Sequence, residues 1–406
     1  MMKISVALLA FAVAFPQQLT YDVRVINIEV PVRVFAGDQF VDHLKLDDFE
    51  VLENGVPQKL EAVYLVKKTT VERGEGKSAS PDGKPAFKPE TARYFYLLFS
   101  VYEYNAKIPE ALTYFFKNVL KSEDHFFVVT PRAVYDLKKE AVGNVTLERT
   151  VDRLTKILRK DIQLGDAAYR SVLNDLKRMA QVGGIEKGTA DKMGEGEEEF
   201  GAYGSGSMEE YFQKYRSDVE ALENLRTMDQ KKLLAFADSL KKINGRKIVY
   251  IFYQKEFVPV LNRAFLMTME NSVVLKPYVT DLFDQFNRAA QVDVPRLKEA
   301  FSDSAVSLYF SYLTKLASDM PANQVAEHSE DVFKSFDEVA KATGGASSSS
   351  ANPAYLMQQA SQAAENYYLL YYSPKDKSVD GKFRTITVRV KTGNYRLAHL
   401  AGYFAK

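Results

Sequence analysis

The stretch YFYLLFSVYEYN, residues 94–105, decides the predicted fold. Its first six residues form an apolar and aromatic run, typical of a strand buried on both faces, and residues 106–121 have helical periodicity. Further strand-like runs alternate with helical patterns, including one long helix over about 208–243. Since this alternation is typical of sheets covered on both faces, we predict an α/β fold with a doubly wound, mostly parallel sheet over 92–364.

Both ends of the chain have a different, strand-like pattern. Apolar and polar residues alternate from Tyr21 to Val34, and Asn54-Gly55 is a hairpin signal. Strand patterns return at 367–372 and 383–390. Because neither end has enough strands for a two-sheet core, we predict one small β-sandwich built from 15–70 plus 365–406, with the α/β domain inserted in it.

Two segments lack periodicity and divide the chain further. Residues 71–91 are polar and rich in glycine, proline and lysine, which predicts a linker. Residues 181–207 contain many glycines and a run of glutamates, which predicts a flexible insertion within the α/β domain.

The N-terminus indicates export. Lys3 precedes an apolar run that ends in Ala12-Val13-Ala14, the pattern of a secretory signal peptide over 1–14. The run is shorter than the roughly 20 residues that span a bilayer, so we expect no transmembrane segment in the mature chain. We therefore expect an exported protein that is periplasmic, at the cell surface or extracellular.

Composition excludes several classes of partner and site. The 54 lysines and arginines nearly balance the 53 aspartates and glutamates, so no global field favours nucleic acid. The chain has no cysteine, which excludes disulfides and thiolate chemistry. At 406 residues and 46% hydrophobic composition it is long enough for a stable core without such bonds.

No catalytic pattern stands out. The four histidines, at 43, 125, 328 and 399, have no metal-ligand spacing, and the chain contains no nucleophile elbow or phosphate-binding glycine loop. Asp47-Asp48 and Glu195–Glu199 are better interpreted as solvated acidic segments. We therefore predict a non-enzymatic protein without a cofactor, and a hydrolase without a known motif is the alternative.

Six motifs in order resemble the secreted von Willebrand factor A-related proteins of the acidobacterial type. They occur at 46–58, 244–249, 343–345, 367–374, 380–384 and 402–403. The resemblance implies a von Willebrand A-like α/β domain, preceded by a β-rich segment, and a metal-ion-dependent adhesion site formed by three loops.

The chain departs from the family pattern at every one of these loops. The corresponding positions are Ser100, Tyr102 and Tyr104 in the first loop, Ile162 in the second, before Asp166-Ala167, and Tyr253, Gln254 and Lys255 in the third. Phenol, isoleucine and ammonium groups are poor ligands for a hard divalent cation, which prefers carboxylate and hydroxyl oxygens. The resemblance therefore implies a degenerate site. Glu103, a carboxylate in the first loop, leaves open a metal-dependent adhesin with a rebuilt site.

We predict that the protein binds another protein or assembles with itself, independently of metal. The predicted binding surface consists of Ser100, Tyr102, Glu103, Tyr104, Ile162, Tyr253, Gln254, Lys255 and Phe257. Lys255 is expected to pair with Glu103 across the mouth of the former metal site. The aromatic rings are expected either to form an exposed contact surface or to fold inward and fill that site.

Overall fold

The computed structural model describes most of the chain from residue 27 onward. The described ranges are 27–76, 89, 91–137, 146–182, 208–225, 228–271, 273, 276–286, 292–314, 325–327 and 329–405. The predicted signal peptide, most of the predicted linker, residues 183–207 of the predicted insertion and His328 lie outside them.

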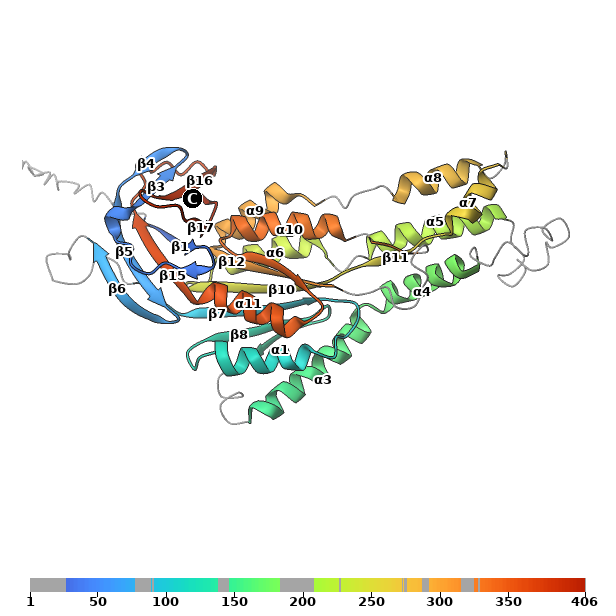
Figure 1. Cartoon of the computed structure of the whole chain (residues 1–406), viewed down its shortest axis with the longest axis horizontal. Coiled ribbons are helices and arrows are strands. Elements are labelled where there is room, and N and C mark those ends of the chain that lie inside the picture. The colour runs from blue at the N-terminus through green and yellow to red at the C-terminus, as the bar shows by residue number, and fades with distance from the viewer. Residues whose placement is uncertain are drawn as a thin grey trace, which may run out of the picture.

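A six-stranded mixed sheet runs through the centre of the molecule (Figure 1). Its order is β14 (Ala346–Ser350), β12 (Val306–Leu313), β10 (Arg246–Gln254), β7 (Arg93–Ser100), β8 (His125–Val129) and β9 (Val134–Leu137). The first five strands are parallel, and β9 runs antiparallel to β8. Every residue of β10 is buried, as expected for a central strand that is covered on both faces.

Helices cover the two faces of this sheet. One face carries α1 (Ile108–Tyr114), the π-helical turn η2 (Phe115–Val119), α3 (Leu147–Gly165) and α11 (Pro353–Glu365). The other face carries α6 (Gln230–Leu240), α9 (Val294–Asp303) and α10 (Glu330–Ala342). Each layer buries an apolar core against the strands.

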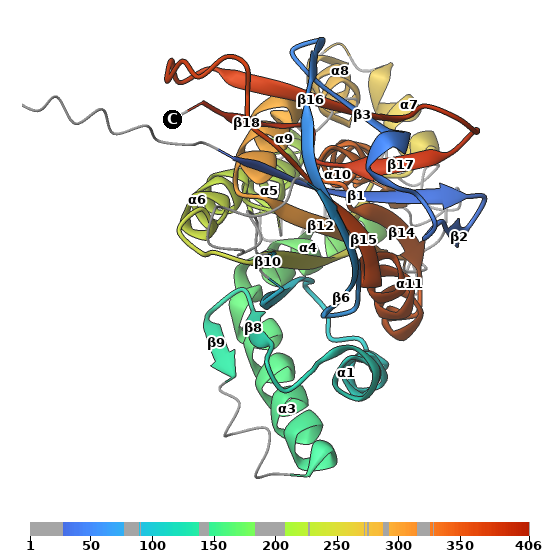
Figure 2. The same cartoon turned by 90° about the vertical axis from the view of Figure 1, so that its left-hand side faces the viewer.

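The terminal β-unit, formed by strands within 28–76 and 366–404, packs at the amino end of the mixed sheet (Figure 2). One curled antiparallel sheet contains β17 (Arg396–His399), β1 (Ile28–Ala36), β15 (Asn366–Tyr372), β5 (Leu60–Lys67) and β6 (Thr70–Gly76), with β2 (Gln39–Phe40) beside β1. The second contains β18 (Gly402–Phe404), β16 (Phe383–Val390), β3 (Phe49–Glu53) and β4 (Val56–Gln58), preceded by the 3-10 turn η1 (Leu46–Asp48). Val32 and Val388 lie in one core between the two sheets.

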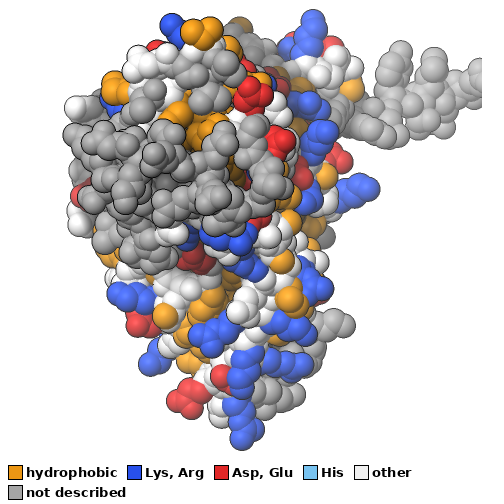
Figure 3. Space-filling model, turned by 90° about the vertical axis from the view of Figure 1, so that its right-hand side faces the viewer, with side chains coloured by type: hydrophobic (Ala, Val, Ile, Leu, Met, Phe, Trp, Pro, Cys, Tyr) orange, Lys and Arg blue, Asp and Glu red, His pale blue; other side chains and the backbone are white. Residues whose placement is uncertain are grey.

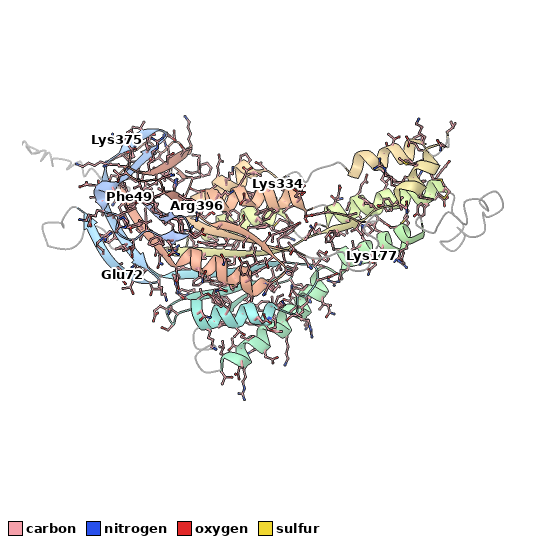
Figure 4. All side chains as sticks on the ribbon, in the orientation of Figure 1. Phe49, Glu72, Lys177, Lys334, Lys375 and Arg396 are labelled. Atoms are coloured by element: carbon pink, nitrogen blue, oxygen red, sulfur yellow. The ribbon has the colours of Figure 1, made fainter. Side chains whose placement is uncertain are left out.

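The remaining elements form an arm that projects from the carboxyl end of the mixed sheet, opposite the terminal β-unit (Figure 1). The arm comprises α4 (Ala167–Val182), α5 (Met208–Asn224), β11 (Phe257–Pro259), α7 (Arg263–Glu270), α8 (Lys276–Phe286) and β13 (Val325–Glu327). It has an apolar core of its own, which includes Tyr169, Tyr215 and Val258. Figure 4 shows the separation, with Lys177 on the arm and Phe49 in the terminal β-unit.

The predicted fold class, a doubly wound, mostly parallel α/β domain inserted in a small β-sandwich, is wrong. Of the described residues, 41% are helical and 34% lie in strands, with a curled antiparallel sheet and a mixed central sheet, and a doubly wound parallel domain is not evident among them. One cause is the turn after β8, where the Thr130 amide donates to the Ala133 carbonyl at 2.9 Å. A connection this short allows only an antiparallel return, because a parallel crossover needs a dozen residues or more.

The prediction of one long helix over 208–243 is also wrong, because the structure has two helices there. α5 ends at Asn224, and α6 begins after Asp229. The Asp229 side chain accepts hydrogen bonds from the amides of Lys231 and Lys232, so it caps a new helix instead of continuing the old one.

The Gly344-Gly345 pair has a clear structural purpose. Gly344 has a φ of +67°, and a Cβ on Gly345 would overlap the backbone of Leu308 in β12. Only glycine allows α10 to end and the chain to pass this close to the sheet before β14 begins.

Candidate functional site

The candidate site lies at the carboxyl edge, the edge of the mixed sheet where the parallel strands end and the arm begins. Tyr253 of β10 lies opposite Ser100 of β7 in the register of the two strands. The Tyr102 hydroxyl donates to the Lys255 carbonyl at 3.1 Å, and the Glu103 amide donates to Oε1 of Gln254 at 3.0 Å. The first and third predicted loops are therefore in direct contact.

The second predicted loop joins them through an arginine. Nη1 of Arg170, on α4, donates to the Tyr102 carbonyl at 2.9 Å and to the Ile162 carbonyl at 3.0 Å. Ile162 itself is 1% exposed and packs in the core beneath α3. All three sequence segments meet at one edge of the sheet, held by an arginine that the sequence analysis did not single out.

Two of the predicted surface tyrosines are buried. Tyr102 is 2% exposed and its ring centroid lies 5.0 Å from that of Tyr169, inside the arm core. Tyr253 is 0% exposed and packs against Phe310 and Tyr312. Burial raises the pKa of Tyr102 above its usual range, so its hydroxyl stays protonated. An exposed contact surface is therefore wrong for these two residues, whose rings fold inward.

The other predicted surface residues, apart from Ile162 and Gln254, are partly accessible. Tyr104 is half-buried beneath the guanidinium of Arg159, which lies 4.9 Å from its ring centroid. Phe257 is also half-buried, with Nζ of Lys255 5.2 Å from its ring centroid. Ser100 and Glu103 have intermediate exposure, whereas Gln254 is 8% exposed.

The predicted ion pair between Lys255 and Glu103 is wrong. Nζ of Lys255 pairs with Oε2 of Glu327, on β13, at 2.5 Å. Oε1 of the same carboxylate accepts from the Tyr312 hydroxyl, also at 2.5 Å. Lys255 comes just before β11, and β11 pairs directly with β13. This pairing brings the Lys255 ammonium group close to the carboxylate of Glu327. The sequence offered no signal for this contact, since β13 is only three residues long.

Two acidic residues at the carboxyl edge, Asp166 and Glu256, lie close enough for their charges to interact. The pKa of Asp166 is raised to about 6, mainly by burial; the charge of Arg170 opposes this rise and the charge of Glu256 adds to it. Oδ2 of Asp166 is buried without a hydrogen-bond partner, and Glu256 is 2% exposed, with its amide bound to Oγ of Ser329. Glu256 was missed although it follows Lys255 directly, because its neighbours Asp166 and Ser329 are distant in sequence.

This arrangement does not fit a hard divalent cation. Across the described ranges no three histidine, cysteine, aspartate or glutamate side chains come close enough to share a metal ion. The Arg170 guanidinium lies where the first and second loops meet and donates to the backbone carbonyls of Tyr102 and Ile162. A cation with six to eight oxygen ligands would have to displace that arginine.

The basic side chains of α3 are a separate feature. Lys and Arg side chains gather over the lower part of the molecule, where α3 lies (Figure 3). They include Arg149, Arg153, Lys156 and Lys160, all exposed, and Lys156 pairs with Asp152 at 2.8 Å. Pairs spaced i,i+4 on an exposed helix are typical of a solvated face, so we do not assign this stripe to the site.

Comparison with known proteins gives no relative: no protein-family model matches the chain, and no curated protein or solved structure matches it significantly. The resemblance to von Willebrand A-related proteins thus stays a prediction from the sequence.

Proposed function

We propose that this protein is a non-enzymatic, exported binding protein that contacts another protein, or a second copy of itself, through the arm and without a metal ion. One observation supports this most. The crevice at the carboxyl edge, where open α/β sheets usually bind ligands, is filled by the protein's own Tyr102, Tyr253 and Arg170. The arm extends beyond that edge, so we assign the proposed contact surface to the arm.

The arm exposes apolar side chains near its end. Met267 on α7 is 51% exposed, and Val273, between α7 and α8, is 92% exposed. Single exposed apolar residues are common, but a projecting element with its own core is suited to hold such residues rigidly toward a partner.

Export rests on the predicted signal peptide over 1–14, which is outside the described residues. Within the described ranges, no helix combines the length and apolar character needed to cross a membrane. Mass spectrometry of the protein purified from its native host tests this part: an N-terminus beginning near residue 15 is expected, and an intact N-terminus retained in the cell contradicts export.

The arm is tested by comparing charged substitutions at two exposed valines. Val273→Asp is made on the arm, and Val379→Asp, at a position 67% exposed in the terminal β-unit, is the matched control. Both should leave melting unchanged, because neither side chain is buried. Cross-linking in the envelope fraction and sedimentation of the purified protein then report on partners and self-association.

We expect Val273→Asp to lose a cross-linked partner or a self-associated species that Val379→Asp retains. If both variants retain the same species, the arm is not the contact surface. Calorimetric titration with magnesium, calcium and manganese tests metal independence separately: no binding heat is expected, and saturable binding would favour a metal-dependent adhesin with a rebuilt site.

A further inference from the structure

Exposed cations form a row along one side of α3. They are Arg149, Arg153, Lys156 and Lys160, which we call the basic stripe. Successive members are separated by a spacing of three or four positions, and side chains at that spacing lie on one face of a helix. At a rise of about 1.5 Å per residue, the row is about 16 Å long. Leu154 and Leu158, which α3 buries in the core, lie on the opposite side.

Few carboxylates balance the basic stripe. Among the described residues, Lys156 is the one member of the stripe with an ion pair, and that pair, with Asp152, is exposed and therefore weak. Glu148 lies in the first turn of α3, where a carboxylate interacts with the helix dipole. Asp161 is buried and accepts hydrogen bonds from two hydroxyl groups beneath α3. Like charges at this spacing destabilise a helix, so an external anion would stabilise α3.

The position of α3 suits a flat partner. In two perpendicular views α3 is the outermost described helix on the lower side of the molecule (Figures 1 and 2). A projecting row can touch a flat surface along its whole length, whereas a single extended chain is held better by a groove. Leu164, four residues beyond Lys160, is 51% exposed. Cations beside an exposed apolar side chain are suited to the interface of an anionic bilayer.

We propose that the basic stripe binds the surface of a bilayer that contains anionic phospholipids. Guanidinium and ammonium groups form charge-assisted hydrogen bonds with phosphate oxygens. Headgroups in a fluid bilayer move laterally, so an anion can lie beneath each cation without a fixed spacing in the partner. α3 then lies parallel to the membrane, with Leu164 at the level of the headgroups. The stripe is not part of the arm, so this proposal does not depend on the proposed contact through the arm.

The test is co-sedimentation of the purified protein with vesicles of phosphatidylcholine, with or without phosphatidylglycerol, in low salt. Each cation near an anionic surface strengthens binding about fivefold, so four should give half-binding at about 1 mM accessible phosphatidylglycerol. Vesicles of phosphatidylcholine alone should leave the protein in solution. Sodium chloride at about 1 M should release the bound protein, because the Debye length falls to about 3 Å.

Two triple variants connect binding to the stripe. The first combines Arg153→Gln, Lys156→Gln and Lys160→Gln, and it should weaken binding about 100-fold. The control combines Lys375→Gln, Lys377→Gln and Lys391→Gln, all exposed in the terminal β-unit, and it should bind as the wild-type protein does. Both change the net charge equally, and neither removes a buried side chain. If the first variant does not fold, Lys160→Gln alone serves, with an expected fivefold loss.

Equal binding by the two triple variants overturns the proposal, as does wild-type protein that ignores anionic vesicles in low salt. Binding to soluble polyglutamate without binding to vesicles also overturns it, and indicates an acidic protein as the partner. Val273→Asp on the arm should bind vesicles as the wild-type protein does, so a failure of the arm contact is distinguished from a failure of the membrane contact.

Discussion

Replacing Tyr102 by alanine should destabilise the protein by about 3–5 kcal/mol, the usual cost of removing a large aromatic side chain from a packed core. The ring is 2% exposed, it packs on Tyr169, and its hydroxyl donates to the Lys255 carbonyl at 3.1 Å. Tyr102→Phe keeps the ring and removes only the hydrogen bond, so it should cost about 1 kcal/mol. The two variants together separate ring packing from hydrogen bonding.

Urea unfolding, followed by circular dichroism, measures both changes from the shift in midpoint at constant slope. Tyr355→Ala is the matched control, because Tyr355 is 48% exposed on α11 and its removal should cost less than about 0.5 kcal/mol. A Tyr102→Ala variant as stable as Tyr355→Ala would refute the reasoning. It would mean that the ring is not part of the core, and that a contact role for Tyr102 must be reconsidered.

Two further predictions concern charges at the carboxyl edge. The folded-state pKa of Asp166, about 6, exceeds its ordinary value of 3.8, so the folded state binds the proton more tightly and stability should fall as pH rises from about 4 to about 6. Asp166→Asn should remove that decline in stability. At pH 7 it should stabilise the protein by roughly 1 kcal/mol, after allowance for the partial exposure of Asp166. Parallel profiles of stability against pH for the wild-type protein and the variant would contradict this. In a double-mutant cycle, Lys255→Met and Glu327→Gln should show a coupling free energy of about 1 kcal/mol. A second cycle with Lys255→Met and Glu103→Gln should show almost no coupling. A larger coupling in the second cycle than in the first would mean that the Lys255 ammonium pairs with Glu103.

The sequence was most informative where one physical signal dominated. The apolar and aromatic run at 248–252 lies within β10, and the run at 94–99 lies within β7, because a strand covered on both faces is mostly apolar. The segments around Tyr102 and Tyr253 do meet, since the ends of neighbouring parallel strands lie on one edge of a sheet whatever their side chains, and Arg170 joins the segment around Ile162 to them.

Features that depend on contacts distant in sequence could not be predicted. The direction of β9 depends on the turn from Thr130 to Ala133, and hydrophobic periodicity does not encode it. Tyrosine suits a core or a surface equally well, so only packing against Tyr169 decides where Tyr102 points. Lys255 had several carboxylates within its reach in principle, and the pairing of β11 with β13 selects Glu327.

The pairing of the first described strand with the last ones has a consequence for synthesis and folding. β1 takes its neighbours β15 and β17 from more than 300 positions later, with Ile28 opposite Tyr372 and Val32 opposite His399. While the ribosome makes the intervening chain, Val30, Val32 and Val34 cannot reach the partners that cover them. Closure of so long a loop comes late, and until then the unpaired strand offers an edge for aggregation. The terminal β-unit should therefore form only after β15 and β17 have left the ribosome, and a holdase present during synthesis should raise the yield of folded protein more than one added afterwards.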